Sequence, residues 1–194
     1  MHDDIVIGPE PRLDRSDAQR LILASEPWIS LGYRESDVDA IVRASSADNL
    51  LVARSGGRVV GFSLSAAGVL LGEYLKILAV EAAYQKRGVG RALMQELERR
   101  AFDRWPNVYL CVSDFNRGAR AFYRGLGYEE VGSLHDLLLP GKGEVLMRKT
   151  IGAWRSFREE SSSQGFEPHV QQPTKSTAHS VRKARVGARS RRNT

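Results

Sequence analysis

Cysteine, histidine and long apolar runs are all scarce in this sequence. Its 194 residues include one cysteine, Cys111, which excludes an intrachain disulfide and a cysteine-based zinc site. The four histidines show no spacing typical of metal ligands, so we predict no bound metal. Cys111 lies in a strand-like apolar run, and we interpret it as a packing residue rather than a nucleophile.

No apolar segment approaches the roughly 20 residues that a helix needs to cross a bilayer. Residues 1–4 also lack the basic and apolar regions of a signal peptide. We therefore predict a cytoplasmic protein without a membrane partner.

The net charge of +6 is concentrated at one end of the chain. From Gly152 onward, nine basic and three acidic residues account for all of it, and apolar residues are few. We predict a domain over residues 1–151 and a disordered, basic tail over residues 152–194, in which Trp154 and Phe157 could extend a last helix onto the domain. Clustered arginine can bind nucleic acid weakly, but residues 171–194 offer no aromatic ring for base stacking, so a solvated tail remains the other interpretation.

Hydrophobic periodicity and turn residues predict an α/β domain with a mixed sheet. A short helix is expected after a cap at Ser16 or Asp17, and a second after Ser36, with Asp39 completing a capping box. Expected helices also cover residues 89–101 and 116–126, with Gly127 as a left-handed cap. The expected strands are residues 5–7, 50–54, 58–65, 74–80, 109–113, 128–131 and 144–149, with residues 69–73 leading into the fourth and a Gly56-Gly57 hairpin turn after the second.

Residues 77–93 form the pattern strand, glycine-containing turn, helix. The first backbone N–H groups of a helix have no intrahelical partner and carry partial positive charge, so this turn can bind a phosphate. Gly88 and Gly90 let a ligand approach the backbone, and Lys86, Arg87 and Arg91 add positive charge. Leu93 stands where a dinucleotide fingerprint needs a third glycine, and no Gly-Lys-Ser/Thr sequence is present.

A second motif runs from Asn116 through Ala119, Phe122 and Tyr123 to Leu126-Gly127-Tyr128. Together with Gln85-x-x-Gly88-x-Gly90, it closely resembles the two signature motifs of the GNAT (Gcn5-related) N-acetyltransferase superfamily, over roughly residues 5–150. The resemblance implies a mixed, mostly antiparallel sheet flanked by helices. It also implies an enzyme that moves the acetyl group of acetyl-CoA to a primary amine by direct attack.

The same resemblance implies the residues of the donor site. The pyrophosphate of acetyl-CoA would lie on the turn, the pantetheine arm would pair with the strand before it, and an amide of Leu78 or Val80 would polarise the thioester carbonyl. Asn116 would hydrogen-bond the pantetheine, and Phe122 would lie at the cofactor while facing the core. The predicted cofactor-binding residues are Leu78, Ala79, Val80, Gln85, Lys86, Arg87, Gly88, Val89, Gly90, Arg91, Asn116 and Phe122.

For the chemistry, the resemblance implies that Tyr123 protonates the departing thiolate, a role suited to a phenol. The alternative is a packed tyrosine with a hydrogen-bonded hydroxyl. Glu73, just ahead of the cofactor strand, is the candidate general base, with a solvated strand-edge glutamate as the alternative. Glu81 and Asp114 are weaker candidates.

Trp28 and Tyr33 lie in the segment that helps to form the acceptor pocket in the GNAT fold. They either line that pocket or pack over the edge of the core. The acceptor is a small amine or a protein N-terminus, and the protein is a monomer or a homodimer. Two alternatives to an N-acetyltransferase remain. The protein could be a nucleic-acid- or ribosome-associated protein that acts through its tail, or a non-catalytic module that binds acyl-CoA.

Overall fold

The structure is a computed structural model that describes residues 4–44 and 49–163. This part of the chain forms seven strands and five α-helices. In chain order they are β1 (Ile5–Pro9), α1 (Arg15–Ile22), α2 (Glu35–Ala44), β2 (Leu50–Ser55), β3 (Arg58–Val69), β4 (Gly72–Val80), α3 (Val89–Phe102), β5 (Asn107–Ser113), α4 (Arg117–Arg124), β6 (Glu129–His135), β7 (Gly143–Thr150) and α5 (Trp154–Ser163).

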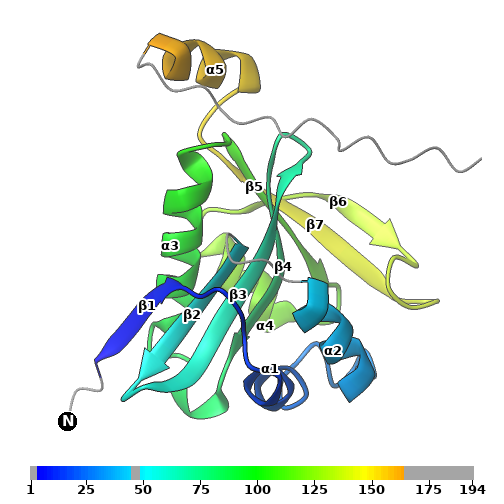
Figure 1. The fold of residues 1–194 in the computed structure, drawn as a ribbon. Helices are drawn as coiled ribbons and strands as arrows, with labels where there is room; N and C mark the ends of the chain where they lie inside the picture. Colours follow the sequence, from blue (N-terminus) through cyan, green and yellow to red (C-terminus); the bar gives the residue numbers. More distant parts are fainter. Residues whose placement is uncertain (1–3, 45–48, 164–194) are drawn as a thin grey trace, which may run out of the picture.

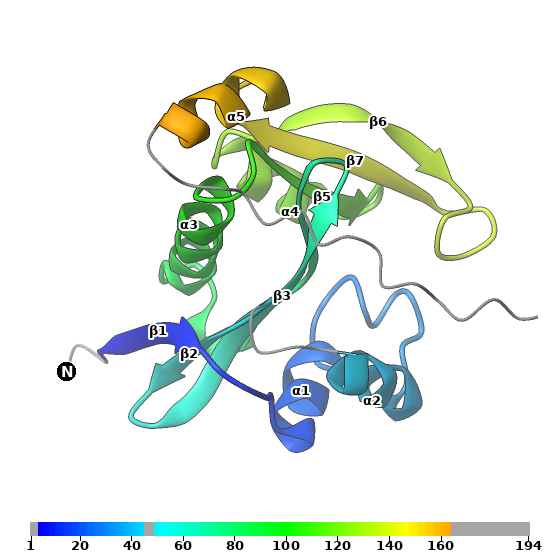
Figure 2. The same ribbon diagram turned by 45° about the horizontal axis from the view of Figure 1, so that its top comes forward.

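The strands form one sheet in the order β1-β2-β3-β4-β5-β7-β6. All neighbours are antiparallel except β4 and β5, which are parallel and are connected through α3. Figures 1 and 2 show α3 on one face of the sheet and the α1–α2 pair on the other. The predicted α/β fold with a mixed, mostly antiparallel sheet is therefore confirmed.

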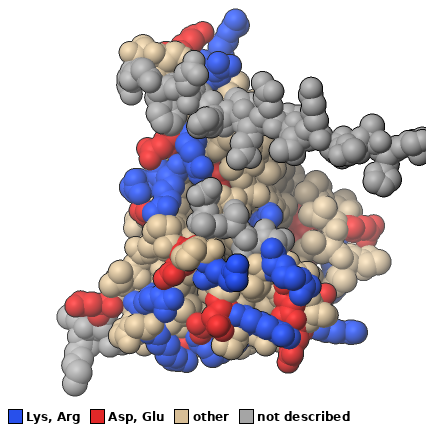
Figure 3. Space-filling model, in the orientation of Figure 1, with Lys and Arg blue, Asp and Glu red and all other residues tan. Residues whose placement is uncertain are grey.

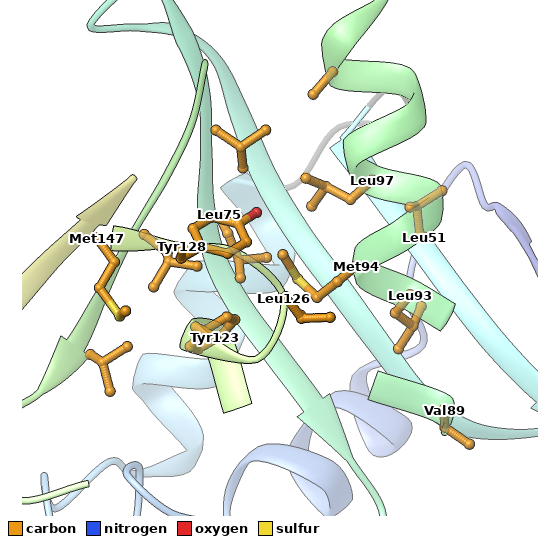
Figure 4. Packing of buried hydrophobic residues seen from close by; sticks show 14 of the residues in the cluster. Leu51, Leu75, Val89, Leu93, Met94, Leu97, Tyr123, Leu126, Tyr128 and Met147 are labelled. Carbon is orange, nitrogen blue, oxygen red and sulfur yellow. The ribbon is translucent and has the colours of Figure 1, made fainter. Parts of the chain in front are cut away.

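Each face of the sheet has its own hydrophobic core. The core under α3 and α4 includes Leu93 and Met94 of α3, Tyr123 of α4, and Leu75 of β4 (Figure 4). The other core packs α1 and α2 against the opposite face and includes Phe62 of β3. A β-bulge at the β3–β4 pairing shifts the register between Leu64 and Ser65 of β3, so β4 residues beyond Leu75 change the face to which they point.

The predicted caps of the first two helices were wrong. The side chain that caps α1 belongs to Asp14, which accepts a hydrogen bond from the backbone N–H of Ser16 at 2.8 Å. At α2, Asp37 accepts from the backbone N–H of Arg34 at 2.8 Å, so Ser36 and Asp39 form no capping box. Asp39 instead pairs with Arg15 of α1 at 2.7 Å, which joins the two helices.

Other boundaries differ in informative ways. The Gly56-Gly57 turn is confirmed, with both glycines at positive φ. β3 continues to Val69, beyond the predicted end at residue 65, and its turn into β4 places Leu70 and Leu71 at φ values of 50° and 58°. Leucine rarely adopts this conformation, so the residue types at these two positions do not predict the turn. α4 ends at Arg124 rather than residue 126, although Gly127 does have a φ of 90°.

The start of the predicted tail is helical. The ring of Trp154 in α5 stacks on Trp105 with a centroid separation of 5.7 Å, and Phe157 lies at 6.1 Å from Trp154. The expected last helix is thus present. Residues 164–194 lie outside the described residues, so the disorder and nucleic-acid contact predicted for them stay predictions.

Charges of both signs are mixed over the face that carries α1 and α2 (Figure 3). They include the ion pairs Arg15–Asp39 and Arg20–Asp17. This mixture agrees with the formal neutrality of residues 1–151. Across residues 4–44 and 49–163, none of the helices has the length and apolar character needed to cross a membrane.

Candidate active site

The centre of the sheet splits between its two parallel strands. β4 and β5 pair over only three positions, from Glu73 opposite Val108 to Leu75 opposite Leu110. Beyond Leu75, β4 remains paired with β3 through Val80 but has no strand partner on its other side within the described part of the chain. The backbone groups on that free edge can therefore pair with an extended ligand, as in β-strand addition.

A cavity of about 450 Å³ lies at this split, within the size range of ligand pockets. Its walls come from both hydrophobic cores: Leu75 and Tyr123 belong to the core under α3, whereas Trp28 and Leu64 belong to the opposite core. The cavity therefore joins the two faces of the sheet through the gap between β4 and β5. Two ligands entering from opposite faces would meet inside it.

The predicted phosphate turn lies at the end of β4. Gly88 occupies the cap position of α3 with a φ of 91°, a conformation that favours glycine, and Lys86 has a φ of 58°. The side chains of Lys86, Arg87 and Arg91 are exposed around the first turn of α3. Positive side chains and free helical N–H groups thus surround one point, as an anion site requires.

Gln85 stabilises this turn. Its side-chain nitrogen donates a hydrogen bond of 3.0 Å to the carbonyl oxygen of Val80, which closes the segment between β4 and α3. The side chains of Ala79 and Val89 are buried in the two cores, so only their backbone groups can contact a donor.

Gly90 and Phe122 lie next to each other at the start of α3. A Cβ atom added at Gly90 would lie 3.6 Å from Phe122 Cζ and 3.7 Å from Val80 Cγ2, with Leu78 at 4.0 Å. Phe122 is half-buried and packs on the edge of the core, as predicted, and its place at the cofactor stays a prediction.

Asn116 caps α4. Its Oδ1 accepts a hydrogen bond of 3.0 Å from the backbone N–H of Ala119, which fixes the orientation of the amide. Both residues line the cavity, and Nδ2 of Asn116 makes no hydrogen bond to any described residue. The side-chain amide of Asn116 is therefore held in place, and its Nδ2 can donate a hydrogen bond to a ligand in the cavity.

Tyr123 is 7% exposed and lines the same cavity. Its ring packs edge-to-face on Phe122 and Tyr128, with centroids at 5.0 and 5.7 Å. Its hydroxyl forms no hydrogen bond within the described part of the chain, unlike the alternative of a packed tyrosine with a satisfied hydroxyl. Burial raises the pKa of Tyr123 above its ordinary value of 10.0, so the phenol keeps its proton at neutral pH.

The position of Glu73 does not support its predicted role as general base. Glu73 is 2% exposed and lies under α3, outside the cavity lined by Tyr123. Its Oε1 accepts a 2.5 Å hydrogen bond from Ser65 Oγ, and its Oε2 lies 3.7 Å from Arg104. The alternative of a solvated strand-edge glutamate is wrong, because the carboxylate is buried. Burial raises the pKa of Glu73, while Ser65 and Arg104 oppose that effect.

The weaker base candidates also lie away from the cavity lining. Glu81 pairs with Arg20 at 2.7 Å and with Arg58 at 3.0 Å, which ties the end of β4 to α1 and β3. Asp114 is exposed and packs against Gly143, where an added Cβ would lie 2.7 Å from its Oδ2. Both have structural contacts that account for their positions.

Trp28 and Tyr33 pack over the edge of the core and also line the cavity, while their role in an acceptor pocket stays a prediction. Their rings meet edge-to-face with centroids 4.8 Å apart, and both pack on the core beside α1 and α2. Both also line the cavity. Trp28 Nε1 is buried and has no hydrogen-bond partner among the described residues.

Sequence reasoning missed several residues of the cavity wall. Glu144, at the start of β7, is 3% exposed and lines the cavity, as do Tyr74, Leu137 and Leu138. Cys111 lines it as well, and burial raises the pKa of its thiol, in agreement with a non-nucleophilic role. The sequence offered one signal for Glu144, namely an acidic residue at the start of an apolar strand. That signal does not show to which face of the sheet the side chain points.

These features define a class of protein: an α/β transferase with a site for an extended, anionic donor beside a through-sheet cavity. Within residues 4–44 and 49–163, no cluster of three or more His, Cys, Asp or Glu residues could hold a metal ion. The sequence model described as "Acetyltransferase (GNAT) family" matches residues 16–128. The chain therefore belongs to the GNAT family, and its activity is that of an N-acetyltransferase.

Individual relatives agree with this assignment. N-alpha-acetyltransferase RimI of Mycobacterium tuberculosis (strain ATCC 25618 / H37Rv) is 37% identical over 134 residues, which cover 62% of this chain and 77% of that protein. The ribosomal-protein-S18-alanine N-acetyltransferase from Escherichia coli has a similar structure, with a TM-score of 0.65 and 19% identity over 77% of this chain and 96% of that one. An aminoglycoside 6'-N-acetyltransferase complexed with coenzyme A gives a TM-score of 0.64 and 21% identity, over 76% of this chain and 98% of that one.

Proposed function

We propose that this protein transfers the acetyl group of acetyl-CoA to the amino group at a protein N-terminus, by direct attack of the amine on the thioester. The observation that carries the proposal is the cavity at the β4–β5 split, which Tyr123 and Asn116 enter from the α4 side and Trp28 and Tyr33 from the α1–α2 side. The relative named N-alpha-acetyltransferase RimI supports a protein N-terminus as the acceptor. A small amine is the other acceptor class.

The donor site fits acetyl-CoA, which supplies an activated acetyl thioester. The amides and cations of residues 86–91 would hold its pyrophosphate at the start of α3. The free edge of β4, from Leu78 to Val80, would pair with the pantetheine arm, and Nδ2 of Asn116 would donate to it. A backbone amide of Leu78 or Val80 would polarise the thioester carbonyl, as oxyanion donors do.

Tyr123 is the general acid in this proposal. Its buried, protonated phenol lies in the cavity wall without a hydrogen-bond partner among the described residues. Burial raises the pKa of a thiol as it raises that of the phenol, so a thiolate in the same cavity is basic enough to accept the proton. A proton from Tyr123 would therefore stabilise the departing sulfur as the carbon–sulfur bond breaks.

The test is the release of free thiol from acetyl-CoA with three acceptor sets: peptides with N-terminal alanine, free amino acids and small amines. We expect turnover with the peptides and roughly 10²-fold slower turnover by Tyr123→Phe, the usual cost of a lost general acid. Turnover restricted to small amines would overturn the acceptor assignment. Binding of acetyl-CoA without turnover of any acceptor would favour the non-catalytic acyl-CoA-binding alternative.

A further inference from the structure

We infer that Glu144 binds the positively charged amino group of the acceptor and takes a proton from it, an inference that rests on the proposed function. No other carboxylate among the described residues is both buried and in the wall of the cavity. Glu26 also lines the cavity, but it is exposed and hydrogen-bonds Ser30.

Strand register explains the position of Glu144. It pairs with Ser113 across the β5–β7 ladder, at the end of β5 that has already separated from β4. Its neighbours Val145 and Met147 belong to the core under α3. Alternation along β7 therefore turns Glu144 to the opposite face, toward the α1–α2 side of the cavity.

The carboxylate of Glu144 is oriented but lacks a counter-ion. Its Oε1 accepts a 2.6 Å hydrogen bond from Ser113 Oγ. Its Oε2 accepts none from the described residues, and no lysine or arginine among them forms an ion pair with it. A buried carboxylate is costly without a compensating cation, and a protonated amine that enters the cavity would supply one.

The surrounding groups make this carboxylate more basic than an ordinary glutamate. Burial is the largest cause that raises the pKa of Glu144, the charge of Asp114 adds to it, and the Ser113 hydrogen bond opposes both. Tyr33, Tyr74 and Cys111 face it from the other walls, and their own pKa values are raised in part by its charge. Lys76, also in the cavity wall, is exposed.

Protons and electron pairs balance over the whole reaction. Glu144 takes one proton from the ammonium, which leaves a neutral amine with a free electron pair. That pair forms the nitrogen–carbon bond to the acetyl group, the carbon–sulfur bond breaks, and Tyr123 gives its proton to the sulfur. The new amide nitrogen loses its second proton to solvent, and Glu144 returns its proton through water to the Tyr123 phenolate.

A matched pair of variants tests the inference. Glu144→Gln keeps the shape of the side chain and an oxygen for the Ser113 hydrogen bond, but it removes the charge. Glu73→Gln makes the same change beside Ser65, outside the cavity. The measurements are steady-state kinetics against pH with a peptide that carries N-terminal alanine, and calorimetric binding of that peptide to the protein saturated with coenzyme A.

We expect Glu144→Gln to lower kcat roughly 10²-fold and Glu73→Gln to leave kcat within about twofold of wild type. In wild type, kcat/KM should fall on the acid side as Glu144 is protonated, at a pKa above 4.5. In Glu144→Gln, this acid limb should move to the pKa of the peptide amine, about 7.7–8.0. Peptide binding should weaken at least tenfold, whereas coenzyme A binding should not change.

Wild-type kinetics and an unchanged acid limb in Glu144→Gln would overturn the inference and leave the proposed function intact. Absence of wild-type turnover with all acceptors would instead contradict the proposed function. In that case peptide binding still decides the role of Glu144: equal affinity of wild type and variant excludes it as the ammonium site.

Discussion

The sheet buries two glutamates in nearly identical local settings, one on each face. The hydroxyl of Ser65 donates a hydrogen bond of 2.5 Å to Glu73, and the hydroxyl of Ser113 donates one of 2.6 Å to Glu144. Burial raises the pKa of both carboxyl groups. They differ in what lies beyond the serine: Glu73 faces Arg104 under α3, and Glu144 faces the cavity that Tyr123 lines.

The difference shows that burial and a raised pKa do not by themselves identify a functional carboxylate. Glu73 lies outside the cavity, and its nearest cation is the partly exposed Arg104 at 3.7 Å. Glu144 has no such cation among the described residues, and its open side faces the cavity. The two glutamates are distinguished by their position relative to the cavity: Glu144 lies in its wall and Glu73 lies outside it.

The largest expected effect distinguishes two tyrosines that touch each other. Tyr123→Phe should lower kcat roughly 10²-fold, because it removes the proton donor to the leaving sulfur. Tyr128→Phe is the matched control: its ring lies 5.7 Å from Tyr123, but it is absent from the cavity lining and should keep the wild-type kcat. Thiol-release kinetics measure both, and equal losses in the two variants would show that the effect of Tyr123 arises from core packing.

The serines provide the next test. Ser113→Ala removes a hydrogen bond that lowers the pKa of Glu144, so the acid limb of kcat/KM should move to higher pH. Ser65→Ala should leave the pH profile unchanged, since Glu73 is outside the cavity. Each variant should also destabilise the protein by about 1–3 kcal/mol, the typical cost of an unsatisfied buried acceptor. If the acid limb of kcat/KM also shifts in Ser65→Ala, Glu73 would belong to the catalytic site.

Glu73→Gln should change stability in a pH-dependent way. Because the folded-state pKa of Glu73 is raised above 4.5, its favourable contribution is complete below that value and is lost as the pH rises through the folded pKa. Glutamine does not titrate, so the stability of the variant relative to wild type should increase as the pH rises above about 4.5 and level off above the folded pKa. Denaturant titrations from pH 4 to pH 8 measure this trend, and a variant whose relative stability falls with pH would contradict the assigned sign.

The smallest expected effect concerns Arg104. Its side chain is 37% exposed and its nitrogen lies 3.7 Å from Glu73, so solvent screens the pair. Arg104→Gln should cost less than about 1 kcal/mol and should not alter kcat or its pH profile. Thermal unfolding together with the thiol-release assay checks both statements. A loss of activity without a loss of stability would place Arg104 in the catalytic machinery.

The elements that carry the proposed donor site were predictable because their signals are local. The strand, glycine turn and helix of residues 77–93 are contiguous, and Asn116 and Tyr123 stand at fixed offsets along one helix and its cap. Their elements are formed as expected, and Tyr123 and Asn116 share one cavity.

The faces to which Glu73 and Glu144 point were not predictable, for a physical reason. Which face a strand residue points to depends on register, and a single bulge reverses it. The bulge on β4 follows Leu75, so Glu73 and Leu75 face α3 while Ile77 and Ala79 join the opposite core. Similarly, Glu144 reaches the cavity only through the pairing of β5 with β7, which brings together residues distant in sequence.

The most direct test of this account is a crystal structure of the protein with coenzyme A. We predict that the pyrophosphate lies on the amides of residues 86–91 and that the sulfur lies in the cavity at hydrogen-bond distance from the Tyr123 hydroxyl. Glu144 should then face the sulfur from the acceptor side, and Glu73 should lie apart from it under α3. A sulfur positioned beside Glu73, or outside the β4–β5 split, would contradict the account.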